Sequence, residues 1–290
     1  MRIVSLVPAA TEIVCALGLR ESLVGRSHEC DFPPDVVELP AVTRSRVDAS
    51  QSSAAIDGDV RRLAAATEAL YDVDADLLAE LHPDLVITQG ACDVCAVPES
   101  QAREVAADVV PDATVLSLSP VRLGDVAADI ERVAAAGGVA DEGAALVARL
   151  AGRINAAGVP VPSPPRVAVL EWLDPPILAG HWTPDVVAAA GCIVAGPPPG
   201  SGSTTATWEG VAALRVDALV VAPCGFDLDR TRQEAADRRE RLWAAAPRVL
   251  LVDGNAYLNR PGPRLADAAE GVAAWLWGRP LPPGFEPLDA

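Results

Sequence analysis

The sequence has no lysine, one methionine and only three histidines among its 290 residues. All 23 basic side chains other than histidine are therefore arginine, and 40 acidic residues outnumber them, giving a formal net charge of -17. A protein that binds nucleic acid needs clustered cations to contact phosphates. The charge balance therefore argues against a nucleic-acid partner.

Long apolar runs and a cysteine framework are also missing. No uninterrupted apolar stretch reaches the roughly 18 residues that a membrane-spanning helix needs. Six cysteines in a chain of this length do not make a disulfide scaffold. Because half of the residues are hydrophobic and only 22% are charged, the chain is globular, and its length suits two cores better than one.

The first residues lack the features of a secretory signal. Such a signal has a basic start, a longer apolar stretch and a small-residue cleavage site. Here the short apolar run that follows Met1-Arg2 is typical of a first strand, and a helical pattern begins soon after Pro8. We therefore expect a cytoplasmic chain, or an extracytoplasmic one if the sequence has been trimmed.

The sequence shows no recognisable catalytic motif. It contains no G-x-S-x-G, no H-E-x-x-H and no paired carboxylates flanking a motif. The glycine- and proline-rich run 196–205 suggests a phosphate loop, but it lacks the G-x-x-x-x-G-K spacing and the chain has no lysine to reach a phosphate. These absences favour a non-enzymatic protein.

Short apolar strands alternate with helices in both halves of the chain. Strands are predicted at 2–6, 23–25, 85–88, 114–118, 166–170, 218–222 and 249–252. The segment 123–157 is mostly helical, with a break at Gly137-Gly138, and the proline-rich stretch 159–165 ends it. We predict an α/β fold of two Rossmann-like lobes with parallel sheets, joined by a long bridging helix. The predicted boundaries are 1–120 for the first lobe, 121–160 for the bridge and 161–290 for the second lobe.

Four motifs follow one another in a characteristic order. They are S-L-V-P-A-A-T-E-I at 5–13, P-D-L-V-I-T-Q at 83–89, G-H-W-T-P-D at 180–185 and N-A-Y-L-N-R-P-G-P-R-L at 255–265. Together they resemble the helical-backbone substrate-binding proteins, the binding components of ABC importers for cobalamin, siderophores and heme. The chain is most similar to the branch labelled cobalamin-binding. The resemblance implies two lobes bridged by one long helix, a ligand held in the cleft between them, little hinge motion and an ABC permease as partner.

Aromatic and imidazole side chains mark a candidate ligand wall in the second half. Trp172, His181, Trp182 and Tyr257 each follow a predicted strand, and prolines near the first three stiffen the backbone. Flat rings on a stiff backbone suit the face of a macrocycle. The same residues also fit another interpretation, in which Trp182 packs into the second core beside a helix start.

Several further residues complete the predicted ligand set. Arg260 or Arg264 would meet a carboxylate or phosphate, and His181 or His28 would supply an axial nitrogen to a bound metal centre. The resemblance places Glu12 at the cleft, although a simple helix-capping pattern explains it equally well. The predicted ligand-binding residues are Glu12, His28, Glu29, Trp172, His181, Trp182, Trp208, Tyr257, Arg260 and Arg264.

A second candidate site combines thiols and an imidazole. Cys92 and Cys95 follow one predicted strand, and His28 and Cys30 follow another. Because parallel strands end at the same edge of a sheet, these four residues make a plausible tetrahedral site for zinc or another borderline metal. A reduced C-x-x-C pair beside a helix-capping aspartate is the alternative interpretation.

Three functions follow from the sequence. The first is non-enzymatic small-molecule binding in an interlobe cleft, with cobalamin, another corrinoid or a metal chelate as ligand. The second is zinc or iron binding or sensing by His28, Cys30, Cys92 and Cys95. The third is an enzyme that acts on a corrinoid or a metal chelate.

Overall fold

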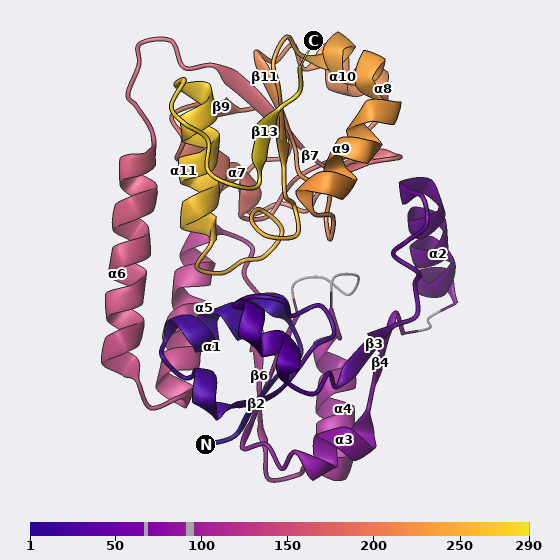
Figure 1. Ribbon diagram of the computed structural model, residues 1–290, viewed down its shortest axis with the longest axis vertical. Coiled ribbons are helices and arrows are strands. Elements are labelled where there is room, and N and C mark those ends of the chain that lie inside the picture. The colour runs from indigo at the N-terminus through magenta and orange to yellow at the C-terminus, as the bar shows by residue number, and fades with distance from the viewer. Residues whose placement is uncertain (67–68, 91–95, 290) are drawn as a thin grey trace. The chain divides into compact units, whose positions relative to one another are not determined.

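The computed structural model describes residues 1–66, 69–90 and 96–289 (Figure 1). The chain forms two compact units. Unit 1 comprises Met1–Pro120 and Asp125–Val147, and unit 2 comprises Val121–Gly124 and Ala148–Ala290. Each unit is built from helices around a sheet, so the α/β fold class predicted from the sequence is confirmed.

Unit 1 has a parallel sheet of four strands in the order β2-β1-β5-β6. The strands are β1 (Ile3–Ser5), β2 (Leu23–Arg26), β5 (Leu85–Gln89) and β6 (Thr114–Leu118). Every residue of β1 and β5 is buried, as expected for central strands covered on both faces. The helices of this unit are α1 (Pro8–Ala16), α3 (Ala75–Glu80), α4 (Glu99–Val109) and α5 (Leu123–Ala136), with short 3-10 turns at Arg20–Ser22 and Pro34–Glu38.

A two-stranded ribbon extends unit 1. It pairs β3 (Thr43–Ser45) with β4 (Tyr71–Val73) in antiparallel fashion, and α2 (Ser53–Ala65) lies between them in the chain. Figure 1 shows α2 at the end of this ribbon. Ser52 is the N-cap of this helix, and its hydroxyl accepts a hydrogen bond from the Ala55 amide at 3.3 Å.

Unit 2 has a sheet of seven strands whose central strands are parallel, as predicted, and whose outer strands include antiparallel ones. The order is β10-β8-β7-β11-β12-β13, and β9 also pairs with β7. The strands are β7 (Arg166–Leu173), β8 (Pro176–Leu178), β9 (Ile193–Val194), β10 (Thr204–Thr205), β11 (Ala218–Val221), β12 (Val249–Val252) and β13 (Phe285–Pro287). The central pairs β7·β11 and β11·β12 are parallel, whereas β8, β10 and β13 join antiparallel. The turn at Asp174-Pro175 accounts for β8, because it returns the chain beside β7 as a hairpin.

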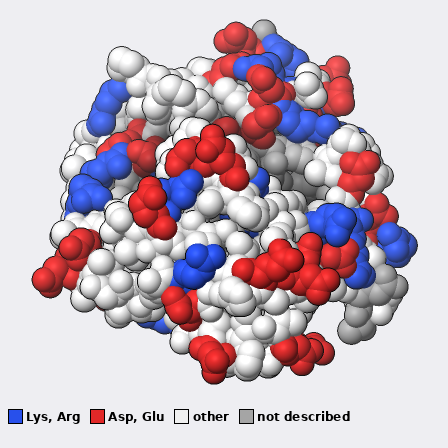
Figure 2. All heavy atoms as spheres, turned by 60° about the horizontal axis from the view of Figure 1, so that its bottom comes forward, with Lys and Arg blue, Asp and Glu red and all other residues white. Residues whose placement is uncertain are grey.

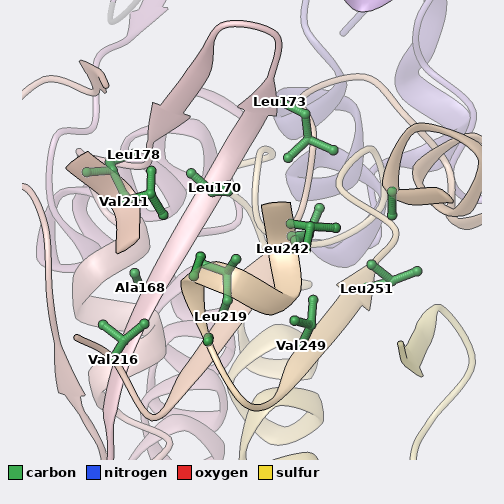
Figure 3. Close-up of a cluster of buried hydrophobic side chains, with 14 of the residues drawn as sticks. Ala168, Leu170, Leu173, Leu178, Val211, Val216, Leu219, Leu242, Val249 and Leu251 are labelled. Carbon is green, nitrogen blue, oxygen red and sulfur yellow. The ribbon is translucent and has the colours of Figure 1, made fainter. Parts of the chain in front are cut away.

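One cluster of buried side chains in unit 2 lies against one face of these central strands (Figure 3). Figure 3 shows Leu170 from β7, Leu219 from β11 and Leu251 from β12 within one cluster of buried side chains. Leu242 and Val211 reach the cluster from helices and are fully buried. The helices of unit 2 are α7 (Thr183–Ala188), α8 (Trp208–Ala213), α9 (Leu228–Asp237), α10 (Arg239–Ala245) and α11 (Leu265–Leu276).

The predicted bridging helix is two helices, α5 and α6 (Ala140–Ala157), separated at Gly137-Gly138 as the sequence indicates. Gly138 has φ +72°, a left-handed conformation that glycine adopts without strain. The chain passes from unit 1 to unit 2 within α6, between Val147 and Ala148. The predicted segment 121–160 is therefore divided between the two units.

The described helices are all too short or too polar to cross a bilayer. On the face that Figure 2 shows, acidic and basic side chains are interspersed among uncharged ones.

The buried leucine of β11 provides a test of the unit 2 core. Leu219→Ala should lower the free energy of unfolding by about 2–5 kcal/mol, because a fully buried side chain leaves a cavity. All six tryptophans lie beyond residue 147, so tryptophan fluorescence during urea unfolding follows unit 2. Leu228→Ala removes the same atoms at a half-buried position and should cost clearly less. Equal losses in the two variants would contradict this account of the core.

Candidate functional site

The candidate site lies in the loops that follow the parallel strands of unit 2. Since β7, β11 and β12 run in parallel as neighbours, their carboxyl ends meet at one edge of the sheet. Ligands of open α/β sheets bind outside this edge. The loops there are joined by backbone hydrogen bonds, from the Cys224 amide to the Glu171 carbonyl at 2.9 Å and from the Asn255 amide to the Phe226 carbonyl at 3.0 Å.

The loop after β12 is packed tightly on the loop after β11. A Cβ atom on Gly254 would lie 2.1 Å from the carbonyl oxygen of Pro223, so only glycine fits there. The side-chain Nδ2 of Asn259 donates to the carbonyls of Ala222 at 2.9 Å and Gly254 at 3.0 Å. These contacts fix the N-A-Y-L-N-R segment as a rigid turn.

His181 lies after β8 with its backbone in the left-handed region, at φ 53°. Its amide donates to the Ser201 carbonyl at 2.6 Å, and its carbonyl accepts from the Gly200 amide at 3.0 Å. A Cβ on Gly180 would lie 2.4 Å from the Ser201 oxygen, so the close approach of the two segments requires that glycine. A non-glycine residue in this conformation is uncommon and persists only where the surroundings impose it.

Trp182 follows directly and caps the start of α7. Its indole Nε1 donates to the Leu258 carbonyl at 2.8 Å, which joins the G-H-W-T-P-D turn to the loop after β12. The His181 and Trp182 rings lie 5.7 Å apart between centroids and are tilted by 35°. Both residues are half-buried.

Tyr257 and the two arginines of the same loop form a neighbouring group. The half-buried Tyr257 ring lies 4.8 Å from the Phe285 ring, its hydroxyl donates to the Pro283 carbonyl at 2.9 Å, and the Arg264 guanidinium stands over it at 5.9 Å. Arg260 is only 5% exposed and donates to the Asn255 side-chain oxygen at 2.8 Å.

Trp172 differs from its predicted position. It lies within β7 instead of in a loop after it, it is 9% exposed, and its indole donates to the Asp174 carbonyl at 3.1 Å. Its ring packs 5.0 Å from the Phe226 ring. Trp172 therefore supports the edge of the sheet from inside. Trp208 opens α8 as expected, and its part-buried ring packs on the core of unit 2.

Glu12, His28 and Glu29 all belong to unit 1. Glu12 is 3% exposed within α1. The His28 Nδ1 atom lies 2.7 Å from the Thr43 hydroxyl, and burial together with the nearby Arg26 lowers the pKa of the imidazole. Glu29 is half-buried, and its amide donates to the Ser27 hydroxyl.

The predicted metal site is only partly visible. Cys92 and Cys95 lie outside the described residues, so the four-residue site stays a prediction. Cys30 is 1% exposed, with its sulfur 3.0 Å from the Thr11 hydroxyl. Within residues 1–66, 69–90 and 96–289, no three His, Cys, Asp or Glu side chains are grouped closely enough to hold a metal ion.

Several residues that support the site are not predicted from the sequence. Asn255 and Asn259 belong to the last motif, and their position in a predicted loop was the available signal. Asp185 closes the G-H-W-T-P-D motif and accepts two hydrogen bonds from the Arg122 guanidinium. Nothing local in the sequence points to Arg122, because its partner is 63 residues away.

Burial of His181 makes the stability of unit 2 depend on pH. Burial lowers the pKa of this imidazole below its usual value, so below about pH 6.5 the unfolded chain binds the proton first. The free energy of unfolding of unit 2 should therefore fall as the pH drops from 7 towards 5. His181→Asn, which tolerates a left-handed backbone, should flatten this dependence, whereas His28→Gln in unit 1 should leave it intact. Tryptophan-monitored urea unfolding across this pH range measures it, and an unchanged slope in His181→Asn would refute the assignment.

Comparison with known proteins finds one matching family model and several similar structures. A family model described as periplasmic binding protein matches residues 3–257. The periplasmic heme-binding protein RhuT from Roseiflexus sp. RS-1, in apo form, is 25% identical, with 96% of this chain and 98% of that chain covered and a TM-score of 0.69. The periplasmic heme-binding protein BhuT in complex with two hemes is also 25% identical, with coverage of 95% and 97% and a TM-score of 0.68.

A third structure, the periplasmic vitamin B12 binding protein BtuF of Vibrio cholerae, shares 21% identity over 95% of this chain and 96% of that chain. Because the identity is this low, the TM-score of 0.64 shows a similar fold and nothing about function. No curated protein sequence matches the chain. Because the family model spans most of the sequence, the chain belongs to the periplasmic binding protein family, the substrate-binding components of ABC transporters, which are not enzymes.

Proposed function

We propose that this chain binds a metal-bearing tetrapyrrole, heme or a corrinoid, and presents it to an ABC permease. The observation that carries the proposal is the backbone clamp on His181, which holds an imidazole beside the half-buried Trp182. The cytoplasmic location and the cleft between the lobes stay predictions from the sequence.

The imidazole has the chemistry of an axial ligand. Its lowered pKa favours the neutral form near pH 7, and a neutral imidazole has one nitrogen with a lone pair for a metal. The backbone hydrogen bonds with Gly200 and Ser201 hold the His181 backbone in place, so less conformational entropy is lost when a ligand binds. The adjacent indole offers a flat apolar surface for the macrocycle.

The arginines of the loop after β12 favour heme over a corrinoid. Heme has carboxylate groups at its edge, whereas corrinoid side chains are mainly amides. A guanidinium matches a carboxylate through paired hydrogen bonds. Arg264 is half-buried beside Tyr257, and Arg260 is buried under the same turn. Two solved structures that resemble this chain are heme-binding proteins, which agrees with this choice.

The proposal is tested by titrating the purified protein with hemin and, separately, with cyanocobalamin, followed by absorbance. Hemin should bind, and His181→Ala should weaken its binding at least about tenfold, or ~1.4 kcal/mol, and shift the absorption band because a metal–nitrogen bond is lost. Trp182→Ala should weaken binding without removing the axial ligand.

His82→Ala serves as the matched control, because His82 is an exposed histidine of unit 1. It should leave both the affinity and the spectrum unchanged. If neither hemin nor cyanocobalamin binds, the proposed function is wrong. If cyanocobalamin alone binds, the corrinoid prediction holds and the choice of heme is wrong.

A further inference from the structure

Four residues that follow β6, the last two of which begin α5, belong to unit 2. The chain leaves unit 1 after Pro120, contributes Val121–Gly124 to unit 2, and returns to unit 1 at Asp125. Within this short segment, Arg122 forms a two-pronged ion pair with Asp185, through Nη2 to Oδ1 at 2.8 Å and Nε to Oδ2 at 3.1 Å. The Leu123 amide donates to the same carboxylate at 3.2 Å.

Asp185 lies three residues after Trp182, in the first turn of α7. Its side chain is 18% exposed and accepts three hydrogen bonds from the segment 121–124. The hydrogen bond from Arg122 is the main reason that the pKa of Asp185 is lowered. The segment therefore holds the start of α7 from one side.

Arg122 also contacts the segment that clamps His181. A Cβ atom on Gly200 would lie 3.1 Å from the Arg122 Cγ and 3.2 Å from its Cδ, so the aliphatic stem of the arginine covers this glycine. Gly200 and Ser201 are the two residues that hydrogen-bond to the His181 backbone. One side chain thus touches both segments that hold the His181–Trp182 turn.

We propose that Arg122 and Asp185 are positioning residues of the ligand site, which hold His181 in its left-handed conformation beside Trp182. The importance of this for a ligand rests on the proposed function, whereas the positioning itself is measurable in the free protein. Most exposed ion pairs contribute little to global stability. Here the local effect should exceed the global one, because the His181 backbone is not in an intrinsically favoured conformation.

The test uses Arg122→Met, which keeps the apolar stem over Gly200 but removes the charge and the donors. In the ligand-free protein, NMR titration of the three histidines should show the lowered pKa of His181 rising towards about 6.5, because the loosened turn exposes the ring. The His181 and Gly200 amides should exchange faster with solvent. Arg122→Lys should restore part of the wild-type His181 pKa and part of the slow amide exchange. Asp185→Asn should show the same two changes as Arg122→Met.

Arg232→Met is the matched control. Arg232 makes the same kind of two-pronged ion pair in unit 2, with Glu286 at 3.1 and 2.7 Å, and it is similarly exposed. This variant should change neither the His181 titration nor the amide exchange. The positioning role would be overturned if Arg122→Met had the His181 titration and amide exchange of the wild type. It would also be overturned if Arg122→Met and Arg232→Met changed these quantities equally.

Binding separates this proposal from the preceding one. Arg122→Met should weaken hemin binding roughly tenfold without the spectral change of His181→Ala, since the axial ligand is kept but less well placed. A wild-type protein that binds neither hemin nor cyanocobalamin refutes the proposed function, while the His181 titration still decides the positioning role. A hemin affinity equal to that of the wild type would refute the link between positioning and binding.

Discussion

The parallel pairing of β7, β11 and β12 is the constraint on which the candidate site depends. Apart from Arg166, Glu171 and Trp172 in β7, these strands consist of valine, leucine and alanine, and those residues are buried because both faces of the sheet are covered. Their carboxyl ends are therefore fixed relative to one another. The loops that follow need few additional contacts, and backbone bonds such as Asn255 to Phe226 and the close approach at Gly254 supply them.

A network of ion pairs reaches the β7–β8 hairpin at the same edge of the sheet. Glu234, whose side chain is 9% exposed, accepts hydrogen bonds from Arg230 and Arg238, and Arg238 reaches on to Asp174 at 3.0 Å. Arg230 also stands over the Phe226 ring at 4.9 Å, and that ring packs on Trp172. Because a guanidinium has several donors in one plane, a single arginine joins two or three partners. Because this chain has no lysine, every basic side chain other than histidine is a guanidinium with several donors.

The sequence predicts those features that depend on local pattern. The strands at Leu85–Gln89 and Val249–Val252, the break at Gly138 and the start of α7 at Thr183-Pro184 each have their cause within a few residues. The hairpin at Asp174-Pro175 was missed, because two prolines do not reveal whether the chain continues or turns back. Trp172 was placed in a loop for the same reason.

Contacts between distant segments leave no local signal at all. The Arg122–Asp185 ion pair and the two bonds that hold His181 join segments 19 or more residues apart. The motif G-H-W-T-P-D points to this turn, but only the structure shows that Asp185 is paired with Arg122 while His181 and Trp182 are half-buried. Residue type alone cannot separate the proposed binding residues from the proposed positioning residues.

The strongly negative charge of the chain restricts how an anionic ligand is captured. With a net charge of -17, the protein as a whole repels heme, but salt screens this repulsion beyond about 8 Å under physiological conditions. Within that distance, the nearest charges determine the electrostatic energy of an anionic ligand. Arg260 and Arg264 lie in one loop beside Tyr257. For the proposed heme ligand, recognition should therefore depend on short-range contacts from the His181–Trp182 turn and the Arg264 loop.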